Sequence, residues 1–471
     1  MQDASVFPEH GTETDGSMSR SAFFRCAVHG LEEQNMDQRR DVQDLINWIG
    51  ASPTAFHAVE SAGKTLRDAR LLQEGEAWHL EAGQVYVVTR NQSSLIAFRM
   101  PEGTPQGFQV VASHTDSPMM KIKQHGELSS SQPYVQLNVE VYGGMIMSSW
   151  FDRPLSVAGR VTFREGRMQK SRLISPDRDL ALIPNVAIHM NRDVNKGFEY
   201  KANVDLMPLW GDGDARGSLL RLAAREAGVP EEDITGWDLF VINRMPGSIW
   251  GGQQVFFSAP RIDNLECAYC SLLALRDARM SRHVQMIAMF DNEEVGSGTR
   301  QGADSDFLSG VMERIALCAG MDRQSYLRAL ASSVMLSADN AHAVHPNHPE
   351  YADPENRVYM NRGIVIKANA NQRYTSDSVS AGLLRHILKD REIPFQDFYN
   401  RSDLRGGSTL GNISGRHVGL CTVDIGLAQL AMHSSYETAG CMDLAFMTEG
   451  MRAFLETDLV CTSDGEFCLE M

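Results

Sequence analysis

A buried strand that runs into a pair of glutamates is the segment that most constrains how this chain folds. The run Val284-Gln-Met-Ile-Ala-Met-Phe290 is apolar apart from one glutamine, and Asp-Asn-Glu-Glu-Val-Gly-Ser follows it directly. An apolar run that ends in turn residues predicts a core strand of an α/β fold. Ligands of such folds bind at the C-terminal edge of the sheet, where Glu293 and Glu294 would lie. Adjacent carboxylates repel each other, so keeping both ionised requires a cation, although a solvated acidic turn would explain the pair on its own.

The same pattern recurs along the chain, where predicted elements begin or end at a histidine or a carboxylate. Further strands are predicted over residues 85–89, 94–98, 108–114, 332–339, 363–368 and 418–425. His114 ends the third of these strands and Asp116 follows it, Asp339 ends the fourth, and His433 comes shortly after the last. Asp263 opens a long predicted helix, where a helix cap is its commoner role. Two histidines, three carboxylates and a spare glutamate are the ligand inventory of a dinuclear zinc-type site.

The middle of the chain has a different character, which divides the sequence into regions. Residues 119–250 show the alternation of polar and apolar residues that is typical of half-buried strands, as in Val135-Gln-Leu-Asn-Val-Glu-Val141. Residues 1–35 are polar and unpatterned, and we expect a disordered tail there. We therefore predict an α/β sandwich with a mixed central sheet, formed by residues 36–118 and 251–471 and interrupted by an inserted β-rich domain.

Composition excludes several classes of protein. The net charge of −16 is spread along the chain, which argues against nucleic acid or an anionic membrane as the main partner. No apolar run approaches the ~20 residues that span a bilayer, and the N-terminus has no signal-peptide pattern. The eight cysteines are scattered, as expected of reduced thiols in a cytoplasmic protein.

Two further motifs have the spacing of metal ligands. Cys267-Ala-Tyr-Cys270 resembles half of a zinc clip, but no second pair matches it, and the buried face of a helix explains it better. His342, His345 and His348 also have a spacing that suits a metal, within a stretch that its prolines predict to be a loop.

The motifs together resemble the aspartyl aminopeptidase family of dinuclear zinc metallopeptidases. The matching segments occur in the family's order and cover the chain from about 40 to 456: Ser113-His-Thr-Asp-Ser-Pro118, Arg261-Ile-Asp-Asn264, Phe290-Asp-Asn-Glu-Glu-Val-Gly-Ser297, Leu336-Ser-Ala-Asp-Asn-Ala-His-Ala-Val-His-Pro346, Gly363-Ile-Val-Ile-Lys367 with Gln372-Arg-Tyr374, and Met432-His-Ser434. The resemblance implies a metallo-aminopeptidase that removes N-terminal residues from peptides. It also implies a homo-oligomer, a dodecamer built from dimers, in which the inserted β-rich domain forms the dimer.

The resemblance assigns roles to individual residues as well. It implies two zinc ions per subunit, for which cobalt or manganese could substitute, held by His114, Asp263 and Asp339 and by Asp263, Glu294 and His433. Two cations that share a carboxylate bind one hydroxide between them, and Glu293 would be the general base. Asp116 would orient His114. His189 would reach the active site of a neighbouring subunit, whereas its apolar sequence neighbours alone predict a buried structural histidine.

Substrate binding is predicted around the strand at 363–368. Lys367 and Arg405 are cations that could pair with an acidic side chain, and Tyr374 lies in a matching motif. The chain departs from the family near Tyr436 and in the loop Asp403-Leu-Arg-Gly-Gly-Ser-Thr-Leu-Gly411, so a preference for Asp or Glu at the peptide N-terminus stays open. Two other functions are considered: a related dinuclear amidohydrolase such as a deacetylase, and a non-catalytic cage protein, although neither a ligand nor the base is missing here.

Overall fold

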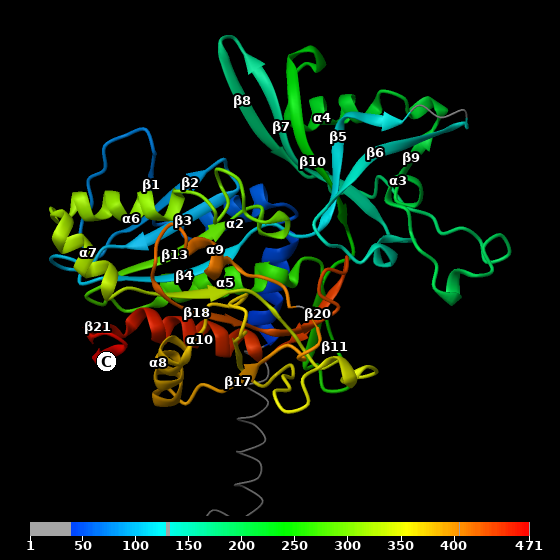
Figure 1. The fold of residues 1–471 in the computed structure, drawn as a ribbon. Coiled ribbons are helices and arrows are strands. Elements are labelled where there is room, and N and C mark those ends of the chain that lie inside the picture. Colours follow the sequence, from blue (N-terminus) through cyan, green and yellow to red (C-terminus); the bar gives the residue numbers. More distant parts are fainter. Residues whose placement is uncertain (1–38, 129–131, 405, 471) are drawn as a thin grey trace, which may run out of the picture.

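A nine-stranded mixed sheet forms the centre of the larger of two lobes (Figure 1). The computed structural model describes residues 39–128, 132–404 and 406–470. In sheet order, the strands are β1 Arg70–Leu72, β2 Val85–Arg90, β3 Ser94–Arg99, β13 Val284–Phe290, β4 Phe108–His114, β14 Val334–Ala338, β18 Cys421–Gly426, β16 Ile364–Lys367 and β17 Phe395–Phe398. The central strands β13, β4, β14 and β18 are parallel, so segments far apart in the sequence end side by side at one edge of the sheet.

Helices cover both faces of this sheet, which explains why its strands are apolar throughout. One face packs against the helical residues 39–50 and against α2 Ala55–Thr65, α5 Ile262–Asp277, α8 Ser378–Asp390 and α10 Asp443–Glu456. The other face packs against α6 Phe307–Cys318, α7 Arg323–Ala331 and α9 Leu410–Ser414. Successive strand residues alternate between the two cores, with Val111 in the first and Val110 in the second. The strand ends at the edge of the sheet are therefore held by a hydrophobic core on each face.

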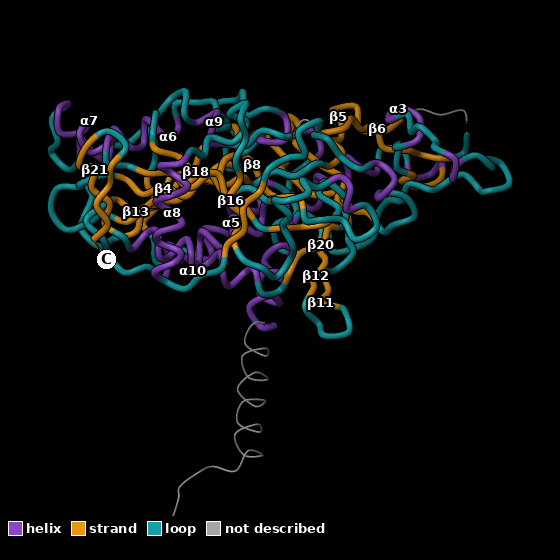
Figure 2. The backbone as a smooth tube through the Cα atoms, turned by 60° about the horizontal axis from the view of Figure 1, so that its bottom comes forward, coloured by secondary structure: helices purple, strands orange, loops and turns teal. Residues whose placement is uncertain are grey.

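The second lobe is an inserted antiparallel sheet with a core of its own (Figure 1). Its six strands, in sheet order, are β8 Met168–Ile174, β7 Leu155–Glu165, β10 Ile234–Asn243, β5 Met119–Leu128, β6 Tyr134–Tyr142 and β9 Leu209–Asp212. The helices α3 Ala202–Asp205 and α4 Ser218–Ala227 belong to the same lobe. Figures 1 and 2 place β6 and α3 at one end of the molecule and the C-terminal hairpin, β21 Asp458–Ser463 with β22 Glu466–Glu470, at the other.

The predicted α/β fold with a mixed central sheet is confirmed, and every strand predicted for that sheet is present. Three features were not predicted: α7, the C-terminal hairpin and a five-stranded sheet made of β11 Ser248–Trp250, β12 Phe256–Ala259, β20 Glu437–Gly440, β19 Ala428–Leu430 and β15 Ala341–His342. Strands of two to four residues are too short to show a hydrophobic period. The predicted tail at 1–35 lies outside the described residues. Within the part of the chain that is described, no helix is long and apolar enough to cross a bilayer.

Candidate metal centre

Three neighbouring strands bring candidate residues to one edge of the central sheet. β4, which ends at His114, lies between the parallel strands β13 and β14. Asp339 directly follows β14, and Glu293 and Glu294 follow β13 in the short 3-10 helix η5 Glu293–Val295. Because the C-terminal ends of parallel strands meet at the same edge, these side chains converge.

Asp263 and His433 join the cluster from outside the central sheet. Asp263 lies in the first turn of α5, and His433 lies between β19 and β20 with a left-handed φ of 68°. Residues other than glycine seldom adopt this conformation, and it is concentrated at functional sites. The donor atoms lie within 4.8 Å of one another in each of two trios, which are His114, Asp263 and Asp339, and Asp263, Glu294 and His433. The structure therefore brings together all five residues that were predicted as metal ligands.

Asp263 is shared between the two trios through its two carboxylate oxygens. Oδ1 lies 3.6 Å from Nε2 of His114, whereas Oδ2 lies 3.3 Å from Nε2 of His433. Asp339 Oδ1 lies 3.6 Å from the same nitrogen of His114, and Glu294 Oε2 lies 3.4 Å from that of His433. A carboxylate that faces two separate sets of ligands is the arrangement that bridges two cations.

The electrostatic environment of the cluster suits cations. Burial lowers the pKa of His114, but three surrounding carboxylates outweigh it and raise this pKa well above its usual value. In the same way, burial lowers the pKa of His433, whereas Asp263 and Glu294 raise it to about 10. Asp263 Oδ1 and Glu294 Oε1 are buried without a hydrogen-bond partner among the described residues. Leaving a buried acceptor unpaired is costly, so these residues fit divalent cations, which would supply the missing partner.

Glu293 lies beside both trios without belonging to either. Its carboxylate forms a third close group with His114 and Glu294. Removal from water raises the pKa of Glu293 to about 8, although the neighbouring His114 lowers it. A carboxyl group whose pKa lies near neutrality can both accept and return a proton.

Hydrogen bonds hold the two histidines in position. Nδ1 of His114 lies 3.0 Å from the backbone carbonyl of Asp116, and Nδ1 of His433 lies 3.1 Å from that of Gly144. In a neutral imidazole, as a bound cation requires, an Nδ1–H that donates to a carbonyl leaves Nε2 unprotonated and turned toward the centre. The Asp116 carboxylate accepts hydrogen bonds from the first two N–H groups of η5, at 3.1 and 3.2 Å. Asp116 therefore lies against the glutamate turn as well as against His114.

Glu437 is a functional candidate that the sequence analysis did not single out. Its side chain is 2% exposed, and its carboxylate accepts hydrogen bonds from the N–H groups of Asp263 at 2.9 Å and His433 at 2.7 Å. It thereby joins the backbones of two candidate ligands. The sequence signal that could have identified Glu437 is its position as an acidic residue at the start of the short strand β20.

Lys367, predicted to bind substrate, is buried beneath the cluster. Its Nζ donates to the backbone carbonyls of Asp339 at 2.7 Å and Asn340 at 3.1 Å, and it lies 3.7 Å from the Asp339 carboxylate. The ring of Tyr374, also predicted for substrate, lies 5.1 Å from this ammonium. Arg405 falls outside the described residues. The contacts of Lys367 support a candidate ligand, and a contact with substrate stays a prediction.

His189 lies on an exposed loop of the inserted lobe. The expectation of a buried structural histidine is wrong, because residues 184–190 are all exposed. Its neighbours Val186, Ile188 and Met190 are 55%, 49% and 82% exposed. His189 belongs to none of the metal-type groups found among the described residues.

The two other motifs with metal-like spacing are also outside those groups. Cys267 and Cys270 are buried on α5, as the helix-face interpretation predicts. The rings of His345 and His348 lie 5.3 Å apart, and His348 pairs with Glu350 at 3.0 Å.

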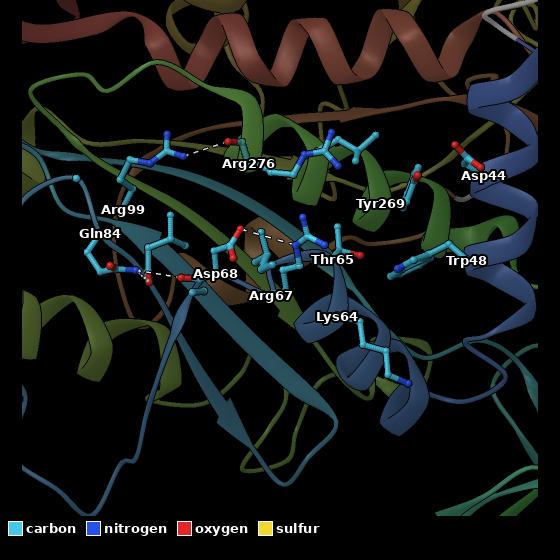
Figure 3. Close-up of a pocket in the computed structure, with 15 residues that line it drawn as sticks. Asp44, Trp48, Lys64, Thr65, Arg67, Asp68, Gln84, Arg99, Tyr269 and Arg276 are labelled. Carbon is cyan, nitrogen blue, oxygen red and sulfur yellow. Dashed lines mark hydrogen bonds and ion pairs between the residues drawn. The ribbon is translucent and has the colours of Figure 1, made fainter.

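Cavities adjoin the cluster on several sides, and another lies elsewhere. A cavity of about 370 Å³ is lined by His342 and Met432, the latter next to His433 in the chain. A cavity of about 770 Å³ lies between α2, the start of β2 and α5, where Trp48 and Tyr269 form part of the wall (Figure 3). None of the candidate ligands lines this second cavity. Two smaller cavities also adjoin the cluster: one of about 130 Å³ is lined by Asp116 and Tyr142, and one of about 10 Å³ is lined by Asp263 and Glu437.

An α/β sheet that carries two linked histidine-carboxylate trios beside a further glutamate is the arrangement of a metallohydrolase, and comparison with known proteins identifies its family. Residues 48–455 match the family described as Aminopeptidase I zinc metalloprotease (M18). The chain belongs to this family, which confirms the predicted resemblance to metallo-aminopeptidases.

Individual relatives cover nearly the whole chain. A Clostridium acetobutylicum protein named Probable M18 family aminopeptidase 2 is 44% identical over 420 residues, which are 87% of this chain and 97% of that protein. A chain in the cryo-EM structure of the Ape4 and Nbr1 complex is 32% identical with a TM-score of 0.85, covering 89% of this chain and 86% of that chain. The structure of the S. cerevisiae mApe1 dodecamer is 26% identical with a TM-score of 0.77, covering 88% and 95%.

Proposed function

We propose that this protein is a dinuclear zinc aminopeptidase that removes residues from the N-terminus of peptides. The observation that carries the proposal is Asp263, whose two oxygens face His114 and His433 separately. The two ions would be held by His114, Asp263 and Asp339 and by Asp263, Glu294 and His433. When ionised, the three ligand carboxylates and Glu293 carry four negative charges, which two divalent cations would balance. Cobalt or manganese could occupy the same nitrogen and oxygen donors.

The residues around the centre divide the chemistry among them. Bound zinc would lower the pKa of water toward ~7 and polarise the scissile carbonyl. Glu293 would take the proton of the attacking water and pass it to the leaving amine, a task that its raised pKa suits. Asp116 keeps the turn of Glu293 in place, and the cavity of about 370 Å³ beside His433 is where the peptide would lie.

Replacement of the proposed base tests this assignment. Glu293→Gln should lower kcat on the order of 10²–10⁴-fold, because general-base catalysis is lost while the ligands remain. Zinc content, measured by elemental analysis, should stay near two per chain. The matched control is Glu449→Gln, at a side chain that is 50% exposed on α10. Near-normal turnover in Glu293→Gln would sink the role as base, and loss of one zinc would make Glu293 a ligand.

The inserted lobe is proposed to form the oligomer, a dodecamer built from dimers. Exposed large apolar side chains mark interaction surfaces, and Val186, Ile188 and Met190 lie together on the loop that carries His189. The related mApe1 structure is a dodecamer. Pairing through this loop would bring His189 to the partner's substrate, where its imidazole could donate a hydrogen bond to the developing oxyanion. Such donors contribute roughly 2.7–4 kcal/mol in other enzymes.

Complementation tests the action of His189 across the interface. His189→Ala protein is mixed with Glu293→Gln protein under conditions that let subunits exchange. Mixed dimers contain one site with both groups intact, so activity should rise above that of either parent. If mass measurements confirm exchange and no activity returns, His189 does not act on the partner.

The proposed substrates are free peptides, and the proposed location is the cytoplasm. The seven cysteines in the described part of the chain are all free, as expected in a reducing compartment. Nothing in the net charge of −16 favours nucleic acid or an anionic membrane as a partner. A panel of aminoacyl substrates checks the reaction class, because hydrolysis of acetylated amino acids but not of free-amine dipeptides would indicate a deacetylase.

A further inference from the structure

Three consecutive residues of the inserted lobe reach the candidate metal centre of their own chain. Strand β6 ends at Tyr142, and Gly143 and Gly144 follow it. The preceding strand of the same hairpin, β5, begins at Met119, shortly after Asp116. Both ends of this hairpin therefore lie beside the centre, although the lobe contributes none of its candidate ligands.

Tyr142 holds the carboxylate of Asp116. Its hydroxyl donates to Asp116 Oδ2 at 2.6 Å and accepts from Asn292 Nδ2 at 2.9 Å. Burial and the nearby carboxylates raise the pKa of Tyr142, so the hydroxyl keeps its proton and remains a donor. The same Asp116 carboxylate accepts from the N–H groups of Glu293 and Glu294. Tyr142 thus connects the inserted lobe to the turn that carries the proposed base and one ligand.

The two glycines contact the other side of the centre. Gly143 has a φ of +73°, and a Cβ built on it would lie 3.2 Å from Cβ of Glu294. A side chain at this position would therefore both strain the backbone and press on a candidate ligand. The carbonyl of Gly144 accepts from Nδ1 of His433 at 3.1 Å, and the N–H of Ile146 donates to the carbonyl of His433 at 2.9 Å.

We propose that Tyr142, Gly143 and Gly144 form a positioning segment through which the inserted lobe sets the geometry of the metal centre in its own subunit. The segment acts on Asp116, Glu294 and His433, and none of its residues belongs to the metal-type groups found among the described residues. This inference rests on the proposed zinc site. It differs from the proposed role of His189, because His189 acts on a partner and the segment acts within one chain.

The first test replaces the tyrosine hydroxyl in the full-length protein. Tyr142→Phe should weaken zinc binding about 10- to 100-fold in a chelator competition, as the loss of other groups that orient ligands does. Under zinc saturation, kcat should fall and KM should change little, because Asp116 no longer holds the turn of Glu293 in place. The matched control is Tyr134→Phe, at a side chain that is 53% exposed at the other end of the same strand.

The second test leaves every hydrogen-bonding side chain in place. Gly143→Ala should displace Glu294 and weaken zinc binding at least as much as Tyr142→Phe does. Gly166→Ala is the control for backbone strain, because Gly166 has a φ of +60° in the same lobe and its added Cβ would meet nothing within 4 Å. If circular dichroism shows that Tyr142→Phe does not fold, the comparison of Gly143→Ala with Gly166→Ala tests the positioning role on its own.

The outcomes separate this inference from the proposed function. Wild-type protein that binds no zinc would overturn the proposed centre itself. Wild-type protein that binds two zinc ions, together with folded Tyr142→Phe and Gly143→Ala variants of unchanged zinc affinity and kcat, would overturn the positioning segment alone. A fall in the melting temperature of the zinc-free protein without a change in zinc affinity would also reject it, because that result describes ordinary packing.

Discussion

Replacing Lys367 by methionine tests whether its ammonium holds the candidate ligand Asp339 in place or binds an acidic side chain of the substrate. The side chain is 2% exposed, and its ammonium contacts two backbone carbonyls and the Asp339 carboxylate. Methionine is of similar length but offers no proton and no charge. The substitution therefore removes one partner of a buried ion pair and leaves the carbonyls of Asp339 and Asn340 without their donor.

The magnitude follows from these contacts. Removing one partner of a buried ion pair costs about 3–5 kcal/mol, because the other charge is left uncompensated. Urea denaturation of the zinc-free protein should show a loss of this size for Lys367→Met. Lys389→Met, at an exposed position on α8, should change the free energy of unfolding by less than about 0.5 kcal/mol. Zinc affinity should fall as well, because Asp339 is then free to move.

Substrate kinetics then decide between the two roles. If Lys367 only supports Asp339, kcat/KM should fall by a similar factor for peptides that begin with Asp, Glu, Leu or Met. A cation that pairs with an acidic side chain contributes ~1.5–3 kcal/mol, so its loss would cost Asp- and Glu-leading peptides about 10- to 100-fold more than the others. An unchanged unfolding free energy combined with that selective loss would refute the supporting role.

Three further predictions concern the buried polar groups and the metal. Glu437→Gln should weaken zinc binding about 10- to 100-fold, because one of the two backbone N–H groups of Asp263 and His433 loses its acceptor; equal zinc titrations of variant and wild type would contradict this. Burial lowers the pKa of His57 from 6.5 to about 4, so the stability it contributes is complete above pH 6.5 and is lost as the pH falls toward 4. Between pH 7 and pH 5 the free energy of unfolding, measured by urea denaturation, should fall by about 2 kcal/mol more in wild type than in His57→Gln. If the unfolding free energies of the two proteins change in parallel with pH, His57 is not the cause. Chelation of zinc should lower the melting temperature and added zinc should restore it, because an ion that binds only the folded state stabilises it; a melting temperature indifferent to zinc would count against the centre.

The sequence predicted those parts of the fold whose signals are local. Strands such as β4 and β13 are continuous apolar runs because both of their faces are covered, and their polar ends marked the edge of the sheet. The strands of the five-stranded sheet are too short to show a hydrophobic period, so they could not be predicted from the sequence. Family resemblance was needed to divide the ligands into two sets, because spacing along the chain does not say which carboxylate is shared.

The supporting residues of the centre could not be found from local pattern. Glu437 bonds to Asp263 across 174 positions of sequence, and Tyr142 bonds to Asn292 across 150. Such contacts exist only after elements far apart in the sequence have packed together, and the bond of Tyr142 also requires the two lobes to meet. The buried contacts of Lys367 could not be predicted for the same reason, since its ammonium donates to the carbonyls of Asp339 and Asn340, which follow β14, two strands away in the sheet.

The wide separation of the ligands along the chain has a consequence for how the enzyme matures. His114 and His433 are 319 positions apart, and domains fold as units while the chain emerges. Both trios therefore cannot exist until the chain has been made as far as His433, so the elements that precede it fold without the complete centre. The newly made protein must hold its clustered carboxylates together unaided. If the proposed zinc site is right, the hydrogen bonds from Tyr142, to Gly144 and to Glu437 would hold the ligands in place before the ions bind.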